Sequence, residues 1–298
     1  MKYKLTKNTK EIDGITLYQI KAIKDFGDVK KGYLGGWIEG EQNLSQIDNA
    51  WVYERAIVYG NASISGNAQI YGWAEVYDNA IVSGEAQVSG EAQVSDDAKV
   101  SGEAQVLGKA QVSGEAHVYG EAQVYGSALV YNKAQVYDHA EVSGEAHVYG
   151  CAQVYDYARV CDHAEVTGEV VVCGKSRVYG EAKVFDDAMV SGDAMVSGEA
   201  HVYGCAIVYD NAVVSGQAQV HGFAAVSGES QVLGNTEVYS KTPVPSDADE
   251  KPKKEIESEY ICEDDFQRII SGDVNEVIID GIKYKKVTQT ITSWRKIS

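Results

Sequence analysis

GEAQVSGEAQVS, at residues 84–95, is the stretch that decides the fold of this chain. It contains two copies of a six-residue unit, x-Ala-x-Val-(Tyr/Ser)-(Gly/Asp), which continues without insertion or deletion from Asn49 to Ser240 as 32 consecutive hexads. Alanine fills the second place in 28 of the 32 hexads, and valine fills the fourth place in 30. Because internal repeats of this kind determine the architecture, we read the rest of the chain outward from them.

The hexad cannot be helical, because a six-residue period rotates the Ala-Val pair around a helix that has 3.6 residues per turn. Glycine also fills the sixth place in 22 hexads, which would be costly inside a helix. As a strand, Ala-x-Val places two small aliphatic side chains on one face and the middle residue on the other. Asp or Asn takes eight of the ten remaining sixth places, which is typical of a turn with unusual backbone angles.

One hexad therefore predicts one short side and one corner of a coil. Three sides close a triangular coil of about 18 residues, and coils stack about 4.8 Å apart. The fold class predicted is an all-β solenoid, a parallel β-helix of about 10–11 triangular coils and about 50 Å long, with Val and Ala in its core. Only five Tyr pairs in the fifth place lie 18 residues apart, about as many as random placement would give, so no selected aromatic ladder is predicted.

The two ends differ from the repeats, which predicts four segments. Residues 1–36 contain alternating runs around Asp13-Gly14 and predict an N-terminal hairpin cap over the first coil. Residues 37–240 form the β-helix, and residues 241–258 hold all three prolines among charges, as a linker does. Residues 259–298 predict a small α+β module, with a helix over 264–270 and a hairpin over 274–287 turning at Asp280-Gly281.

Composition limits the function classes. The formal net charge is −18, of which −17 falls on the repeats, so direct binding to nucleic acid or to anionic lipid is not expected. No apolar run is long enough to span a membrane, and no signal segment follows the lysines of residues 1–10, which favours the cytoplasm. Five scattered cysteines do not make a disulfide framework.

The repeats resemble the hexapeptide-repeat proteins, in which an aliphatic residue is followed four places later by a small one, as in Val52 with Ala56 and Val58 with Ala62. The opening segment, residues 34–53, resembles the YdcK-like branch of that family, whose members are labelled acetyltransferases by similarity. The resemblance implies a left-handed winding, transfer of an acyl group from coenzyme A, a catalytic histidine beside a protruding loop, and a homotrimer with the cofactor between subunits. The unbroken repeat departs from this plan, because it leaves no protruding loop.

The candidate catalytic residues are His147, His201 and Glu165, which together with Lys183 are predicted to form one outward column. His147 and His201 would lie three coils apart, about 14 Å, which is too far for one metal ion or one proton relay. A solvated surface is the simpler interpretation. No Cys-x-x-Cys or His-x-x-x-His cluster is present, so no metal site is predicted. The corner cysteines are interpreted as tolerated small residues: Cys151, Cys161, Cys173 and Cys205.

Val171, Met189 and Ile207 succeed one another at 18-residue spacing in outward places. They form the preferred contact surface for a protein partner or a second copy of the chain.

Three functions remain open from the sequence. The first is a non-catalytic rigid scaffold or protein-binding rod that needs no cofactor. The second is an acetyl- or acyltransferase that uses a coenzyme A thioester. The third is an acidic DNA-mimic inhibitor, because the repeats carry one negative charge per roughly 3 Å of rod, against one per about 1.7 Å in duplex DNA.

Overall fold

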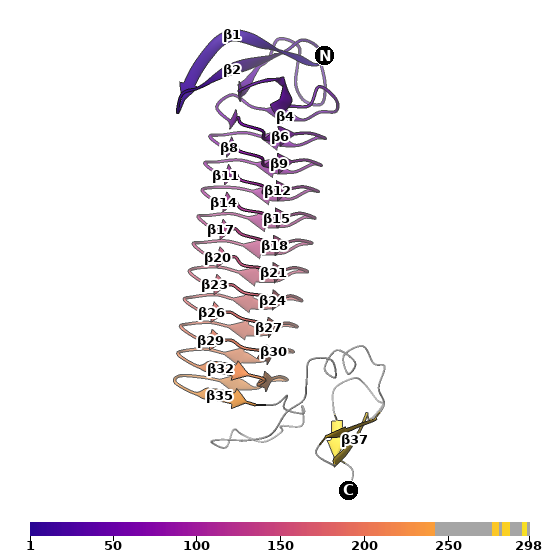
Figure 1. The fold of residues 1–298 in the computed structure, drawn as a ribbon, viewed down its shortest axis with the longest axis vertical. Helices are drawn as coiled ribbons and strands as arrows, with labels where there is room; N and C mark the ends of the chain where they lie inside the picture. The colour runs from indigo at the N-terminus through magenta and orange to yellow at the C-terminus, as the bar shows by residue number, and fades with distance from the viewer. Residues whose placement is uncertain (242–275, 280–281, 287–293, 297–298) are drawn as a thin grey trace.

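The chain is an all-β solenoid of about 11 parallel-stacked turns, which begins with a β-hairpin (Figure 1). The computed structural model describes residues 1–241, 276–279, 282–286 and 294–296. Each turn contributes one short strand to each of three sheets, so the rod has three walls. The predicted fold class is confirmed, and the 3-10 helix η1 (Glu41–Asn43) is the sole helical element of the described residues.

Sheet I has 14 strands and includes the N-terminal hairpin. Its strands in spatial order are β1 (Tyr3–Ile12), β2 (Ile15–Ala22), β3 (Leu34–Ile38), β5 (Ile57–Val58), β8 (Glu75–Val76), β11 (Gln93–Val94), β14 (Gln111–Val112), β17 (Leu129–Val130), β20 (His147–Val148), β23 (Glu165–Val166), β26 (Lys183–Val184), β29 (His201–Val202), β32 (Gln219–Gly222) and β35 (Glu237–Ser240).

Sheets II and III have 11 and 10 strands. Sheet II consists of β4 (Trp51–Val52), β7 (Gln69–Ile70), β10 (Gln87–Val88), β13 (Gln105–Val106), β16 (Gln123–Val124), β19 (Glu141–Val142), β22 (Arg159–Val160), β25 (Arg177–Val178), β28 (Met195–Val196), β31 (Val213–Val214) and β34 (Gln231–Val232). Sheet III consists of β6 (Ser63–Ile64), β9 (Ile81–Val82), β12 (Lys99–Val100), β15 (His117–Val118), β18 (Gln135–Val136), β21 (Gln153–Val154), β24 (Val171–Val172), β27 (Met189–Val190), β30 (Ile207–Val208) and β33 (Ala225–Val226).

Within the hexads the register is constant: each strand residue pairs with the one 18 places later, as Gln87 does with Gln105. The second-place alanines from Ala50 to Ala224 and the fourth-place valines between them are fully buried and form one continuous core. Side chains this small suit a narrow three-walled interior, because close packing leaves no room for larger ones.

Backbone-to-backbone hydrogen bonds between coils run in one direction. The N–H groups of the first, third and fifth places donate to carbonyls of the following coil, as Gln87 does to Ala104 at 2.9 Å and Ser89 to Val106 at 2.9 Å. The repeat strands other than β32 and β35 are shorter than the predicted Ala-x-Val and cover only the third and fourth places. In many hexads the alanine N–H instead donates within its own coil, to the fifth-place carbonyl three residues earlier. Ala86, for example, donates to the Ser83 carbonyl at 3.3 Å.

The corners have the predicted backbone conformation. All 22 sixth-place glycines and all eight sixth-place Asp and Asn residues have positive φ. This is the region that glycine enters freely and that Asp and Asn tolerate best among the other residues. The consensus at the sixth place is therefore explained by the backbone alone.

The N-terminal hairpin extends sheet I beyond the first coil. β1 and β2 pair antiparallel around the predicted turn, where Asp13 and Gly14 both have positive φ. β2 pairs antiparallel with β3, and β3 pairs parallel with β5. The boundary predicted between residues 36 and 37 thus lies inside β3, which belongs to both the cap and the first coil.

Donors from the cap reach carbonyl groups at the N-terminal end of the rod. The buried Lys2 ammonium donates to the carbonyls of Ile47, Asp48 and Ala50 at 3.1, 3.2 and 2.7 Å. The Tyr3 hydroxyl donates to the Leu44 carbonyl at 2.7 Å. Because bonds between coils run one way, the first coil has carbonyls that no earlier coil can satisfy, and these donors replace that coil.

The C-terminal end of the rod differs from the N-terminal end. No further coil follows β35 within residues 1–241, and Leu233 and Tyr239 of the last coil are 47% and 46% exposed. Further along, β36 (Glu276–Ile279), β37 (Ile282–Lys286) and β38 (Trp294–Lys296) form an antiparallel three-stranded sheet. β36 pairs antiparallel with β37, and the turn predicted between them, at residues 280–281, lies outside the described residues. The helix predicted over 264–270 lies outside the described residues.

Candidate functional site

The predicted outward column exists on sheet I. His147, Glu165, Lys183 and His201 occupy the third places of β20, β23, β26 and β29, and each pairs with the next in register. All four side chains are on the outer surface of the wall, because the alternating valines fill the core. The column is therefore a solvent-facing polar stripe.

Glu165 is the best-connected residue of the column. Its carboxylate accepts a hydrogen bond from the Tyr149 hydroxyl and lies 2.9 Å from the Lys183 ammonium. These two contacts, the Tyr149 bond first, lower the pKa of Glu165 below its ordinary value. The same hydrogen bond raises the pKa of Tyr149 to about 12. Glu165 is thus held ionised near neutral pH, which makes it a weak general base.

The two candidate histidines are not brought together. β23 and β26 separate β20 from β29, which places His147 and His201 about 14 Å apart. Phe185 meets the His201 ring edge-on at a centroid distance of 6.2 Å. No group of three or more His, Cys, Asp or Glu side chains suited to a metal ion occurs in the described part of the chain.

A shallow hollow of about 330 Å³ lies beside the column. Glu165, Thr167, Lys183, Phe185 and Asp186 line it. It offers an ammonium group and two carboxylates, but no nucleophile whose activating base lies within hydrogen-bond reach among these residues. What the arrangement can do chemically is bind a polar group at the surface.

Sequence reasoning missed the contacts between His and Glu along the walls. Of the four histidines outside the column, His139 and His163 lie 3.3 Å from Glu121 and Glu145, each 18 residues earlier. His221 lies 2.8 Å from Glu237. The signal for the first two is simple: a Glu and a His in the first places of hexads 18 residues apart share a corner in neighbouring coils.

A second relation links the fifth place to the third place of the next coil, 16 residues later. The Tyr71 hydroxyl donates to Gln87 at 2.6 Å, and Tyr149 donates to Glu165 in the same way. Tyrosine followed 16 residues later by Gln or Glu is a signal that the sequence contains. It would have identified Tyr149 as the partner of Glu165.

The other predicted surface residues lie where the spacing placed them. Val171, Met189 and Ile207 pair in register on β24, β27 and β30 of sheet III, and all are partly exposed. Among the corner cysteines, burial raises the pKa of Cys161 and of Cys173. These two thiols stay protonated near neutral pH, which disfavours a nucleophilic role.

Comparisons with known proteins find similarity over a short stretch of the chain. No protein-family model matches the chain. A stretch of 41 residues is 49% identical to the Uncharacterized acetyltransferase YdcK of Escherichia coli (strain K12). That stretch covers 14% of this chain and 13% of the relative, so the match spans a small part of either protein. No helix within the described residues has the length and apolarity that a membrane crossing requires.

Proposed function

We propose that this chain is a rigid, non-catalytic rod that presents its flat walls to a protein partner or to other copies of itself. The observation that carries this proposal is the constant 18-residue offset between paired strands from β4 to β34. With no residue inserted in residues 49–240, no loop leaves the walls to enclose a substrate.

The chemistry of the polar column agrees with this function. Glu165 is already engaged by Tyr149 and Lys183, and the two histidines of the column are three strands apart. The Tyr149 and Lys183 contacts lower the pKa of this carboxylate, so it is a weak base for abstracting a proton. The apolar stripe of Val171, Met189 and Ile207 supplies a contact surface instead.

Calorimetric titration with coenzyme A and acetyl-coenzyme A, together with a thiol-release assay, tests the proposal. The rod hypothesis expects no binding heat and no release of free thiol above the rate without protein. Binding of either compound that is lost in His147→Ala but retained in His117→Ala would overturn it. His117 is the matched control, because it occupies the same hexad place on sheet III.

Acyl transfer is the second candidate function, favoured by the partial similarity to YdcK and by the outward histidines of the column. It requires the site to form between two copies of the chain, with the hollow beside Lys183 as one of its walls. In that case the thiol-release rate should rise with protein concentration more steeply than in direct proportion. A rate strictly proportional to concentration in the range where the chain associates would contradict an inter-subunit site.

A further inference from the structure

A second hollow, of about 520 Å³, lies near the N-terminal end of the rod. Its walls are the corner between β4 and β5, the corner between β7 and β8, and the cap loop before β3. Asp28, Tyr53, Arg55, Gln69 and Trp73 are among its lining residues. We call it the cap groove. Along sheet I it is separated from the polar column by β11, β14 and β17.

Four of the residues that line the cap groove are aromatic: Tyr33, Tyr53, Tyr71 and Trp73. Trp73 is 58% exposed, which is unusual for so large a side chain on a rod whose aliphatic residues are mostly buried. The Arg55 guanidinium lies over its ring, 4.6 Å from the centroid. Beside it, Tyr71 meets Tyr53 edge-on at 6.1 Å, and Tyr53 meets Tyr33 at 6.4 Å. The lining of the groove thus includes flat ring surfaces, of which Trp73 is open to solvent.

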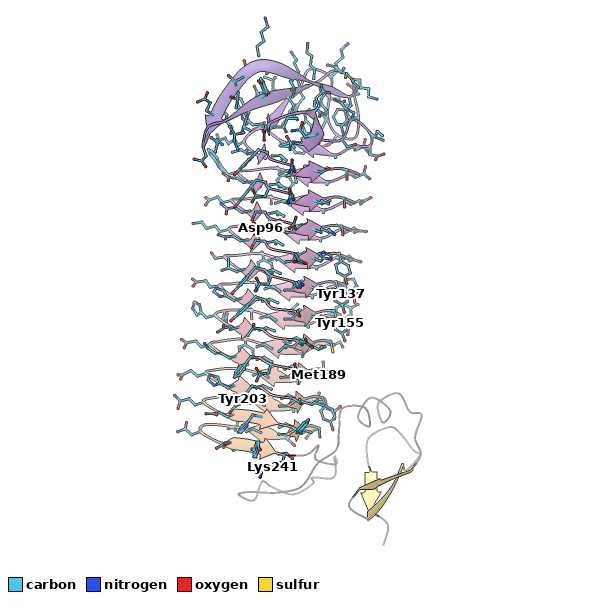
Figure 2. All side chains as sticks on the ribbon, in the orientation of Figure 1. Asp96, Tyr137, Tyr155, Met189, Tyr203 and Lys241 are labelled. Atoms are coloured by element: carbon cyan, nitrogen blue, oxygen red, sulfur yellow. The ribbon has the colours of Figure 1, made fainter. Side chains whose placement is uncertain are left out.

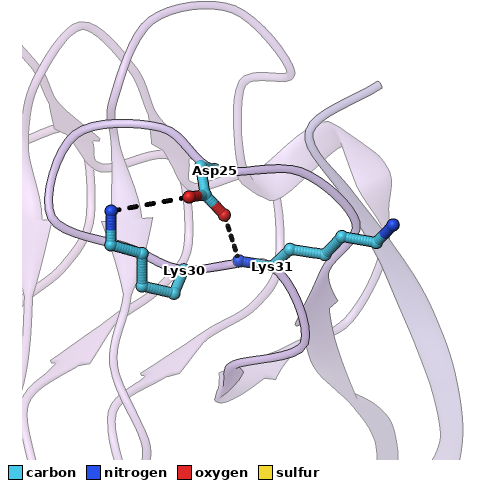
Figure 3. A network of polar contacts seen from close by, with 3 residues as sticks. All are labelled: Asp25, Lys30 and Lys31. Atoms are coloured by element: carbon cyan, nitrogen blue, oxygen red, sulfur yellow. Dashed lines mark hydrogen bonds and ion pairs between the residues drawn. The ribbon is translucent and has the colours of Figure 1, made fainter.

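The cap loop that carries Asp28 is held in place by contacts on both sides of that residue. The Asp25 carboxylate accepts the Lys31 N–H at 2.7 Å and lies 3.5 Å from the Lys30 ammonium (Figure 3). Inside this turn, Phe26 and Val29 bond to each other through their backbones. Phe26 packs against Trp51 with ring centroids 5.3 Å apart. The loop is therefore fixed by contacts before and after Asp28.

The tip of that loop delivers Asp28 to the groove. The Tyr53 hydroxyl donates to Asp28, with both carboxylate oxygens 2.8 Å away, and the Tyr33 hydroxyl donates to Glu54 at 3.1 Å. Asp28 and Glu54 have no cationic partner within ion-pair distance among the described residues. Each carboxylate keeps lone pairs for further donors, while Arg55 supplies N–H donors and Gln69 supplies both kinds of group.

We propose that the cap groove binds a saccharide, with a pyranose ring packed on the face of Trp73 that Arg55 leaves uncovered and its hydroxyls bonded to Asp28, Glu54 and Gln69. A sugar ring has an apolar C–H face and a rim of hydroxyls that both donate and accept, so it matches an aromatic surface edged by mixed polar groups. An organic cation fits less well, because the Arg55 guanidinium already lies on the Trp73 ring and would repel it. The proposal is independent of the rod function.

A printed panel of oligosaccharides and polysaccharides, probed with the full-length chain, tests the proposal. We expect binding to at least one glycan, followed in solution by a Kd on the order of 1 mM for a single sugar unit in so shallow a site. Trp73→Ala should weaken the binding about tenfold or more. Asp28→Asn should weaken it as well, because the amide replaces one acceptor with a donor.

Tyr157→Ala is the matched control. Tyr157 is 56% exposed and occupies the same first place of its hexad as Trp73, but far from the groove. It should retain full binding, and thermal unfolding should show all three variants folded. The proposal is overturned if no glycan on the panel binds, if Trp73→Ala and Tyr157→Ala bind equally well, or if choline binds in a Trp73-dependent manner while the glycans do not.

Discussion

At the scale of single residues, aspartate does more at the sixth place than tolerate positive φ. Where a glycine occupies the sixth place 18 residues later, the aspartate carboxylate accepts that glycine's N–H in every case, at 2.9–3.2 Å. The five aspartates are Asp96, Asp156, Asp162, Asp186 and Asp210. The side chain thus satisfies a corner N–H that the glycine-on-glycine corners leave to solvent.

Replacing a crowded corner glycine should destabilise the rod. Gly90 has a φ of +75°, and an added Cβ would stand 2.7 Å from the Gly108 carbonyl oxygen. We expect Gly90→Ala to lower the free energy of unfolding by about 1–3 kcal/mol, measured by chemical denaturation. Gly228→Ala is the control, since its φ is +63° but its Cβ would meet nothing within 4 Å. Equal losses in the two variants would contradict a role for crowding between coils.

Glu165 should make the stability depend on acid. Because its folded pKa lies below its ordinary value of 4.5, its contribution is present above that pH and is lost as the pH falls through the folded pKa. The difference in melting temperature between wild type and Glu165→Gln should therefore be larger at about pH 7 than at about pH 3. Glu181→Gln is the control, because Glu181 is exposed and has no such contact. A pH-independent difference would contradict the ion pair.

At the scale of the elements, counting tyrosines alone does not predict how the rings of neighbouring coils stack. All five Tyr pairs at 18-residue spacing make ring contacts, four of them stacked, including Tyr137 with Tyr155 at 4.9 Å (Figure 2). A longer ladder mixes residue types: Phe185, Tyr203, His221 and Tyr239 stack at 4.8, 4.7 and 4.7 Å. The number of Tyr pairs does not exceed chance, whereas this ladder forms because Phe and His rings in the fifth place also stack with Tyr.

The N-terminal cap should depend on its buried lysine. Lys2→Met leaves three carbonyl acceptors without their donor, which costs about 1–3 kcal/mol. We expect faster hydrogen exchange at the amides of Trp51 and Tyr53 in the first coil, measured by mass spectrometry or NMR. Lys4→Met, an exposed position on β1, should leave both amides unchanged. Unchanged exchange in Lys2→Met would show that the cap does not need this donor.

The repeats could be predicted from the sequence better than the segments outside them. The interior and the corners could be predicted, because burial and backbone angle are fixed by the hexad itself. The polar column could be placed from the 18-residue period. The Tyr149 to Glu165 bond follows a 16-residue offset that the sequence contains, but the offset has a meaning only once the coil geometry is known. The cap groove could not be predicted, because Asp28 reaches Tyr53 from a loop without any repeat.

At the scale of the whole molecule, self-association is expected through one wall. Val171, Met189 and Ile207 form a continuous apolar stripe on sheet III. If copies of the chain meet there, Met189→Lys should lower the mass measured by light scattering after gel filtration, because a buried unpaired charge is costly. Met195→Lys is the control, since Met195 is equally half-buried but lies on sheet II. An identical mass in wild type and Met189→Lys would remove this wall as the contact.

The unbroken register also fixes the angle between distant parts of the rod. Deleting 18 residues would bring the cap groove and the polar column about 4.8 Å closer and leave both facing as before. Deleting a single hexad would instead turn everything beyond the cut by about a third of a revolution, so that the column would face another direction with its local packing intact. The number of whole hexads thus sets the direction that the column faces relative to the groove, and the number of triplets sets the distance between them. A lineage could vary the two separately by gaining or losing repeats.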